Sequence, residues 1–305
     1  MAHAEMKSIT IGTNPSGSTF FLIGGAFAKL FQEELGIRST AQPNAGSSVY
    51  LPMIEVGDMT LGVSSTVDAS MAYRGDGYPI EAKKLRAIAS VWKLPYAYIV
   101  TGDSGIEKME DLKGKRVMGN MPTNVALTSI NKVMLEGGGL DVDDVDFAQS
   151  GGLLDGIKAV VEGRADAAPV ATAMPVLVES NQSAPGGLRI VSNGAAASDD
   201  EFYSSRVPGT RVMTVKPSER TPFIVGETEI LSYDTYLVAS SEMSDDDAYL
   251  LAKTLHANWE QLQKDYGPFR GVAKDELGAA ESDVPYHPGA IRFYKEAGIW
   301  DEGSE

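Results

Sequence analysis

Strand and helix alternate along this chain, and polar loops mark each change from strand to helix in its first third. Apolar residues over 8–13, 37–42 and 60–64 predict short strands, each followed by Gly, Ser, Thr or Asn. Helical spacing then predicts helices that end near Gly36, Gly57 and Gly75. This alternation specifies a parallel sheet, and it places the three polar loops at the carboxyl edge of the strands.

The same alternation resumes in the middle of the chain, from about residue 117 to 191, and indicates a second lobe. Strand-like segments at 94–101 and 233–239 separate this middle part from the flanking pieces. We therefore expect an α/β protein with one lobe formed by 1–98 plus 237–305 and another by 99–236. Two chain crossings would form a hinge that permits closure around a ligand. The segment 194–232 shows no regular pattern.

The composition excludes several classes of partner. The 305 residues carry a formal charge of −16, which argues against nucleic acid or anionic lipid as a partner. With 0 Cys there is no disulfide or thiolate chemistry. No apolar run reaches the roughly 20 residues of a membrane span, so we expect no membrane insertion. The first residues, Met-Ala-His-Ala-Glu, are not a signal peptide, because they lack an apolar region.

The first polar loop is the strongest candidate for a ligand site. Asn14, Ser16, Ser18 and Thr19 surround the expected start of a helix, where backbone N–H groups attract anions. The glycines do not match a dinucleotide fingerprint, and no Lys follows them as in a phosphate-binding P-loop. A turn around Asn-Pro would explain two of the residues but not the run of hydroxyls. The pattern favours ligand contact.

Equivalent strand-to-helix junctions supply further candidates. Each of these loops taken alone is more typical of a helix cap, but caps need not cluster on one sheet edge. Trp92 is equally consistent with a ligand-facing wall and with a buried packing role. The candidates beyond the first loop are Phe20, Ser47, Ser48, Ser65, Thr66, Trp92, Asn120, Thr123, Asn124 and Thr172.

No residues at catalytic or metal-binding spacing accompany these loops. The 3 histidines, His3, His256 and His287, form no metal pair, and no serine lies in a nucleophile elbow. We therefore expect no catalytic residue, no metal and no cofactor. This combination favours a protein that holds a ligand over one that transforms it.

The sequence also resembles a known family, the TAXI group of TRAP-transporter solute-binding proteins. The resemblance rests on Gly12-Thr-Asn-Pro-Ser-Gly-Ser-Thr-Phe-Phe-Leu-Ile-Gly-Gly25, Gln42-Pro-Asn-Ala-Gly-Ser-Ser-Val49 and the segment 57–75. Near the end, the stretch from Val284-Pro-Tyr-His-Pro-Gly to Ile299-Trp300 is similar to the closing signature of that family.

The resemblance implies a periplasmic receptor with a two-lobed fold like that of type II periplasmic binding proteins, each lobe a mixed sheet flanked by helices. It implies a small carboxylate ligand, such as glutamate, glutamine or a dicarboxylate, and delivery to a TRAP-type membrane permease. By position it assigns ligand contacts to Ser18, Thr19 and Phe20, to the Ser47–Ser48 pair, and to Ser65.

Two other functions stay open. A receptor for an ABC-type importer of sulfonates or pyrimidines would share the two-lobed plan. An enzyme on the same scaffold is the less favoured alternative, because it would need a reactive His, Cys or Lys near the candidate loops.

Overall fold

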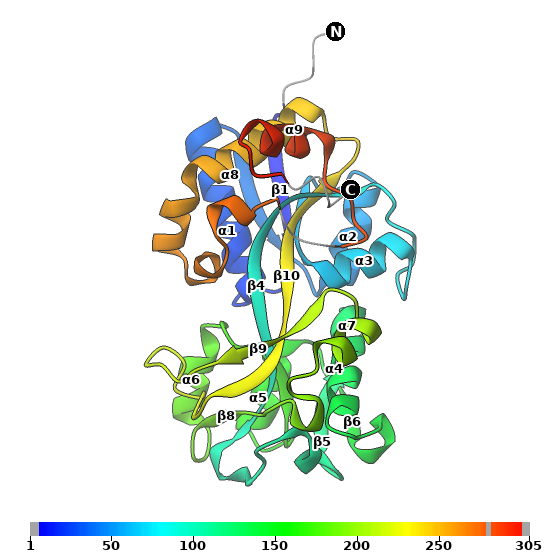
Figure 1. The fold of residues 1–305 in the computed structure, drawn as a ribbon, viewed down its shortest axis with the longest axis vertical. Coiled ribbons are helices and arrows are strands. Elements are labelled where there is room, and N and C mark those ends of the chain that lie inside the picture. Colours follow the sequence, from blue (N-terminus) through cyan, green and yellow to red (C-terminus); the bar gives the residue numbers. More distant parts are fainter. Residues whose placement is uncertain (1–5, 279–281, 301–305) are drawn as a thin grey trace. The chain divides into compact units, whose positions relative to one another are not determined.

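The computed structural model describes residues 6–278 and 282–300, and their backbone forms two compact units (Figure 1). Unit 1 comprises the described residues up to Ser16, then Phe20–Lys93, and those from Asp234 onward. Unit 2 comprises Gly17–Thr19 and Leu94–Tyr233. Two long strands, β4 (Leu85–Thr101) and β10 (Thr228–Ser240), each contribute residues to both units. The predicted two-lobed α/β architecture, with mixed sheets flanked by helices, is confirmed.

Unit 1 is built on three adjacent parallel strands in the order β2-β1-β3. Thr13 lies opposite Pro43 and Gly12 opposite Gly62, so the carboxyl ends of the three strands meet at one edge. β10 joins β3 in antiparallel orientation, with Thr235 opposite Ser65. The three parallel strands are β1 (Ser8–Thr13), β2 (Arg38–Pro43) and β3 (Leu61–Ser65).

Helices cover both faces of this sheet because successive strand residues point to opposite sides. Gly24 of one helix packs against Thr13, Ala41 and Ile11, whereas Tyr50 of the next packs against Gly12 on the other face. The helices of unit 1 are α1 (Thr19–Leu35), α2 (Ser47–Glu55), α3 (Thr66–Arg74), α8 (Asp245–Asp265) and α9 (Pro288–Glu296) (Figure 1).

Unit 2 repeats the alternation with a different sheet arrangement. β4 pairs antiparallel with β7 and β8, β10 pairs antiparallel with β9, and β5 and β6 form a parallel pair. Its strands are β5 (Arg116–Asn120), β6 (Asp146–Gln149), β7 (Ala168–Ala171), β8 (Leu188–Ile190) and β9 (Thr210–Val215). Its helices are α4 (Val125–Gly137), α5 (Leu153–Val161), α6 (Val176–Ser183) and α7 (Asp200–Arg206).

Two expectations about elements were wrong. The segment 194–232, which showed no pattern, contains α7, β9 and the first residues of β10. β4 begins at Leu85, nine residues before its expected start at 94, and continues through Pro95. The strand tolerates this proline because its carbonyl still accepts a hydrogen bond, at 2.9 Å, from the backbone N–H of Thr172.

Within the described ranges, no helix combines the length and the apolar character that crossing a membrane requires.

Candidate functional site

The carboxyl edge of the unit 1 sheet brings several strand-to-helix junctions together. The Asn44 backbone N–H donates to the Thr13 carbonyl at 2.9 Å, which joins the loop after β2 to the end of β1. The single hydroxyl proton of Thr13 is shared between the carbonyls of Asn14 and Gln42, at 3.0 and 3.2 Å, and so links both loops. The predicted gathering of polar loops at one edge is thus present in this unit.

A buried carboxylate, which the sequence analysis overlooked, ties two of these junctions together. Asp68 lies in the first turn of α3 and is 1% exposed. It accepts hydrogen bonds from the hydroxyls of Ser47 at 2.5 Å, Ser65 at 2.6 Å and Tyr78 at 3.1 Å. Ser65 also caps α3, because its Oγ accepts from the Asp68 backbone N–H at 2.9 Å.

This network changes the role of two predicted ligand contacts. The hydroxyl protons of Ser47 and Ser65 are donated to Asp68, and both side chains are buried. Through Asp68 they link the start of α2 to the start of α3. The spacing Ser65-Thr-Val-Asp68 matches the sequence pattern of a helix start, and this signal could have revealed Asp68 from the sequence.

Burial raises the pKa of Asp68 above its ordinary value of 3.8, although the three hydroxyl donors oppose the shift. A carboxyl group whose pKa is raised by folding stabilises the folded state most below 3.8, and this contribution is lost as the pH rises through the folded pKa. We therefore expect the free energy of unfolding of the wild type, relative to that of Asp68→Asn, to fall as the pH rises from below 3.8 through the folded-state pKa of Asp68. Urea unfolding of both proteins across this range measures it, and a constant difference would contradict the raised pKa.

Several polar atoms at the same edge are buried and have no hydrogen-bond partner among the residues that the structure describes. They include Asn14 Oδ1, Thr66 Oγ1 and Thr235 Oγ1. Thr66 is the first residue of α3 and is 1% exposed, and Thr235 lies opposite Ser65 on β10. Such atoms are costly to bury unpaired, so they indicate places where a ligand or water supplies the missing bond.

An aromatic pair belongs to the same unit. Phe20 in the first turn of α1 and Trp92 on β4 meet edge to face, with ring centroids 6.3 Å apart. Both side chains are buried, at 6% and 3% exposure, so they are packed against protein rather than open to solvent. The structure brings these two candidates together.

Positive charge is scarce around this edge. Arg74, eight residues after Thr66, and Lys93, next to Trp92, are both engaged by carboxylates. Arg74 pairs with Asp76 and Asp283, and Lys93 pairs with Glu276 at 3.1 Å. An anion at this edge would therefore be stabilised mainly by helix N-termini and hydroxyl groups. Ser16 is exposed and Ser48 half-buried there.

The remaining candidates lie in unit 2. Ser18 and Thr19 group with this unit by contact, and Thr19 Oγ1 is also buried without a partner in the described part of the chain. Asn124 caps α4, since its Oδ1 accepts from the Leu127 backbone N–H at 3.1 Å. Asn120 ends β5, Thr123 precedes the cap of α4, and Thr172 follows β7. Their meeting with the unit 1 residues at one ligand stays a prediction.

The histidines that the structure describes have structural roles. His287 caps α9: its Nδ1 accepts from the Gly289 backbone N–H at 3.2 Å, and its Nε2 lies 3.1 Å from the Met243 carbonyl. Burial lowers the pKa of His287 and keeps the ring neutral. His256 packs its ring against Phe293. His3 lies outside the described residues. Over 6–278 and 282–300, no group of three His, Cys, Asp or Glu side chains is arranged to hold a metal.

Solved structures of binding proteins share this fold. The alkanesulfonate-binding protein SsuA from Xanthomonas axonopodis pv. citri, bound to MOPS, is 15% identical with a TM-score of 0.56, over 99% of this chain and 82% of that one. PhnD1 from Prochlorococcus marinus (MIT 9301), in complex with methylphosphonate, is 13% identical with a TM-score of 0.58, over 96% of each chain. A binding protein component of an ABC phosphonate transporter from Pseudomonas aeruginosa is 13% identical with a TM-score of 0.57, over 90% and 80%.

The resemblance to the TAXI family, and the TRAP receptor with a carboxylate or amino-acid ligand inferred from it, were wrong. The three solved proteins named above are sulfonate- and phosphonate-binding proteins, and the sequence family that matches is a different one. The loops misled because Gly, Ser and Thr at strand-to-helix junctions suit any small anion at a helix N-terminus, so they do not distinguish families. The match to the NMT1-like family extends over residues 11–298, and this chain belongs to that family.

Proposed function

We propose that this protein is the solute-binding receptor of an ABC-type importer and that its ligand is a small organic sulfonate or phosphonate. Its fold is that of proteins that bind such ligands. The observation that carries the proposal is the carboxyl edge of unit 1, where α2 and α3 begin side by side and Thr66 Oγ1 is buried without a partner in the described structure.

The chemistry of this edge suits a sulfonate or phosphonate group. Such a group presents three acceptor oxygens in different directions, and two helix N-termini with adjacent hydroxyls present donors from different directions. The ion pairs of Arg74 and Lys93 leave stabilisation of the ligand's charge to these neutral groups. Asp68 holds the two helix starts in the geometry that the anion needs while its own carboxylate is masked by three hydroxyl donors.

Binding without chemical change, delivery to a membrane permease and a periplasmic location are parts of the same proposal. One solved protein with this fold is a binding protein component of an ABC phosphonate transporter, which supports a non-enzymatic role. The caps and packing contacts of His287 and His256 provide no general base, which weighs against the enzyme alternative.

Replacing Thr66 with valine tests the site. The change keeps the side-chain shape and removes a hydroxyl that bonds to nothing in the described structure, so folding should be unaffected while the ligand loses a donor. We expect ethanesulfonate or methylphosphonate to bind about tenfold more weakly, a loss of about 1.4 kcal/mol. Isothermal titration calorimetry of the full chain measures this difference.

Thr254→Val is the matched control, because this threonine is also buried but bonds to the Leu250 carbonyl within α8. Its affinity for the anion should equal that of the wild type. If both variants bound the anion with the same affinity, Thr66 would not be a ligand contact. Binding of uracil with no binding of either anion would favour a pyrimidine receptor, and conversion of the ligand during incubation would favour an enzyme.

A further inference from the structure

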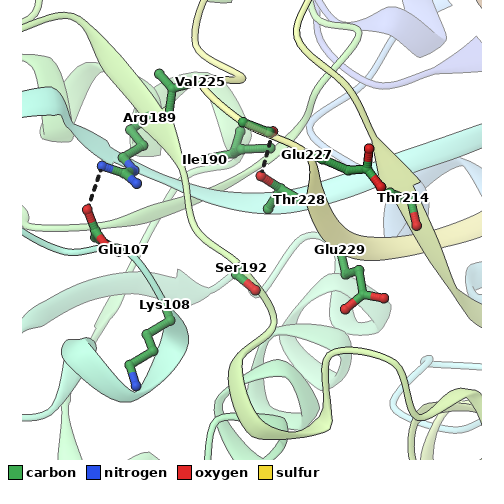
Figure 2. Close-up of a pocket in the computed structure, with 11 residues that line it drawn as sticks. Glu107, Lys108, Arg189, Ile190, Ser192, Thr214, Val225, Glu227, Thr228 and Glu229 are labelled. Atoms are coloured by element: carbon green, nitrogen blue, oxygen red, sulfur yellow. Dashed lines mark hydrogen bonds and ion pairs between the residues drawn. The ribbon is translucent and has the colours of Figure 1, made fainter.

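Unit 2 contains a polar cavity, separate from the residues of the proposed ligand site. It has a volume of about 650 Å³, and all of its lining residues lie between 107 and 229 (Figure 2). The wall is formed by the segment Glu107–Lys108, by Arg189 and Ser192 in and after β8, by Thr214 of β9, and by the start of β10. Small-molecule sites have volumes of roughly 300–1,000 Å³, so the cavity is large enough for a ligand.

The carboxylates around the cavity already have partners. Glu107 pairs with Arg189 at 3.0 Å, and Glu227 pairs with Lys216 at 3.2 Å. Both oxygens of Glu229 accept from the hydroxyl of Ser198, at 2.8 and 2.9 Å. A single hydroxyl occupies few of the acceptor positions of a carboxyl group, so Glu229 has lone pairs for a further donor.

Several donors in the wall, by contrast, have no acceptor among the described residues. Arg189 uses one N–H for Glu107, and its other N–H groups have no partner there; the same holds for the Lys108 ammonium. The hydroxyl protons of Ser192 and Thr214 also have no acceptor in this part of the chain. Figure 2 shows Arg189 and Lys108 on one side of the cavity and Glu227 and Glu229 on the other. Glu107 lies on the side of the two cations, so two basic groups and one carboxyl group face two carboxyl groups across the cavity.

We infer that this cavity binds a small zwitterion, with its anionic group at Arg189 and its ammonium group at Glu229. A bidentate guanidinium contact suits a carboxylate, because the free N–H groups of Arg189 form a planar fork. The carboxylate of Glu229 attracts the ammonium group, and Ser192 and Thr214 add neutral hydrogen bonds. This site is independent of the proposed oxyanion site in unit 1.

Titration of the full chain with three probes, followed by heteronuclear NMR at the backbone amides around Ser192, tests the inference. The probes are 4-aminobutanoate, butanoate and n-butylammonium, which carry both charges, the anion alone and the cation alone. We expect saturable shifts with 4-aminobutanoate and at least tenfold weaker binding of the other two. Equal affinity for butanoate and 4-aminobutanoate would overturn the inference, as would the absence of saturable shifts.

Variants separate the cavity from general charge effects. Arg189→Gln and Glu229→Gln should each weaken 4-aminobutanoate binding at least tenfold. Arg220→Gln and Glu219→Gln remove the same charges from exposed positions outside the cavity wall and should leave the affinity unchanged. Equal loss in the control variants would overturn the inference. Arg189→Gln should keep the ethanesulfonate affinity of the wild type, so failure of this cavity and failure of the proposed function are distinguishable.

Discussion

Replacement of Asp68 by alanine is expected to lower the free energy of unfolding by roughly 3–5 kcal/mol. Each buried donor left unpaired costs about 1–3 kcal/mol, and small movements of the surrounding side chains recover part of the sum. Three donors are affected: Ser47 is 0% exposed, Ser65 1% and Tyr78 8%. Urea unfolding at neutral pH followed by circular dichroism measures the loss. The variant should also bind the ligand more weakly, because α2 and α3 lose their shared anchor.

Asp247→Ala is the matched control, since Ser244 and Asp247 form the same capping arrangement at the start of α8. Ser244 Oγ donates to the Asp247 carboxylate at 2.8 Å and accepts from its backbone N–H at 3.0 Å, as Ser65 does with Asp68. The control carboxylate is half-buried and has a single hydroxyl donor, so we expect a loss of about 1 kcal/mol. Similar losses in the two variants would show that Asp68 is only a helix cap.

Alanine at two neighbouring glycines of α1 is expected to change stability in opposite directions. A Cβ on Gly24 would collide with Thr13 Cγ2, and Thr13 cannot rotate away without losing its bonds to the Asn14 and Gln42 carbonyls. Overpacking of this kind costs about 1–3 kcal/mol. A Cβ on Gly25 meets no atom within 4 Å, so Gly25→Ala should gain about 0.5–1 kcal/mol from helix propensity.

The same unfolding experiment measures both glycine variants, and each serves as the other's control because they share a helix and a substitution. Gly24→Ala should in addition weaken anion binding, since Thr13 fixes the loops at the carboxyl edge. A stabilised Gly24→Ala protein would mean that α1 moves away from β1 at little cost, and would contradict tight packing at this junction.

The periodic parts of the fold could be predicted from the sequence with good boundaries. The helices expected to end near Gly36, Gly57 and Gly75 are α1, α2 and α3, which end at Leu35, Glu55 and Arg74. The pattern failed where local signals conflict with the tertiary structure. The strand expected at 94–101 is the second part of β4, and its first nine residues, 85–93, were missed although most of them are buried. The short α7 and β9 were missed because polar and Gly-rich residues surround them.

The candidate site was only partly predictable for a related reason. Hydroxyl-rich junctions are visible in the sequence, but the partner of each hydroxyl is set by residues far along the chain. Ser47 and Ser65 were predicted to contact ligand, yet both donate to Asp68, whereas Thr66 keeps a buried hydroxyl without a partner in the described structure. The charged cavity of unit 2 gave no sequence signal, because Glu107, Arg189 and Glu229 come from separate segments.

The sequence by itself determined the alternation of strands and helices and the clustering of polar junctions at one sheet edge, because hydrophobic periodicity and helix capping are local properties of the chain. It also determined the absence of thiol chemistry, since there are 0 Cys. Only the tertiary structure decided which junction hydroxyls are hydrogen-bonded to the protein itself and which could bond to a ligand. Hydrogen-bond partners and burial depend on contacts between distant segments. Short motifs of small polar residues indicate a helix N-terminus that can bind an anion. Which anion the site prefers depends on how the donor groups are arranged in space.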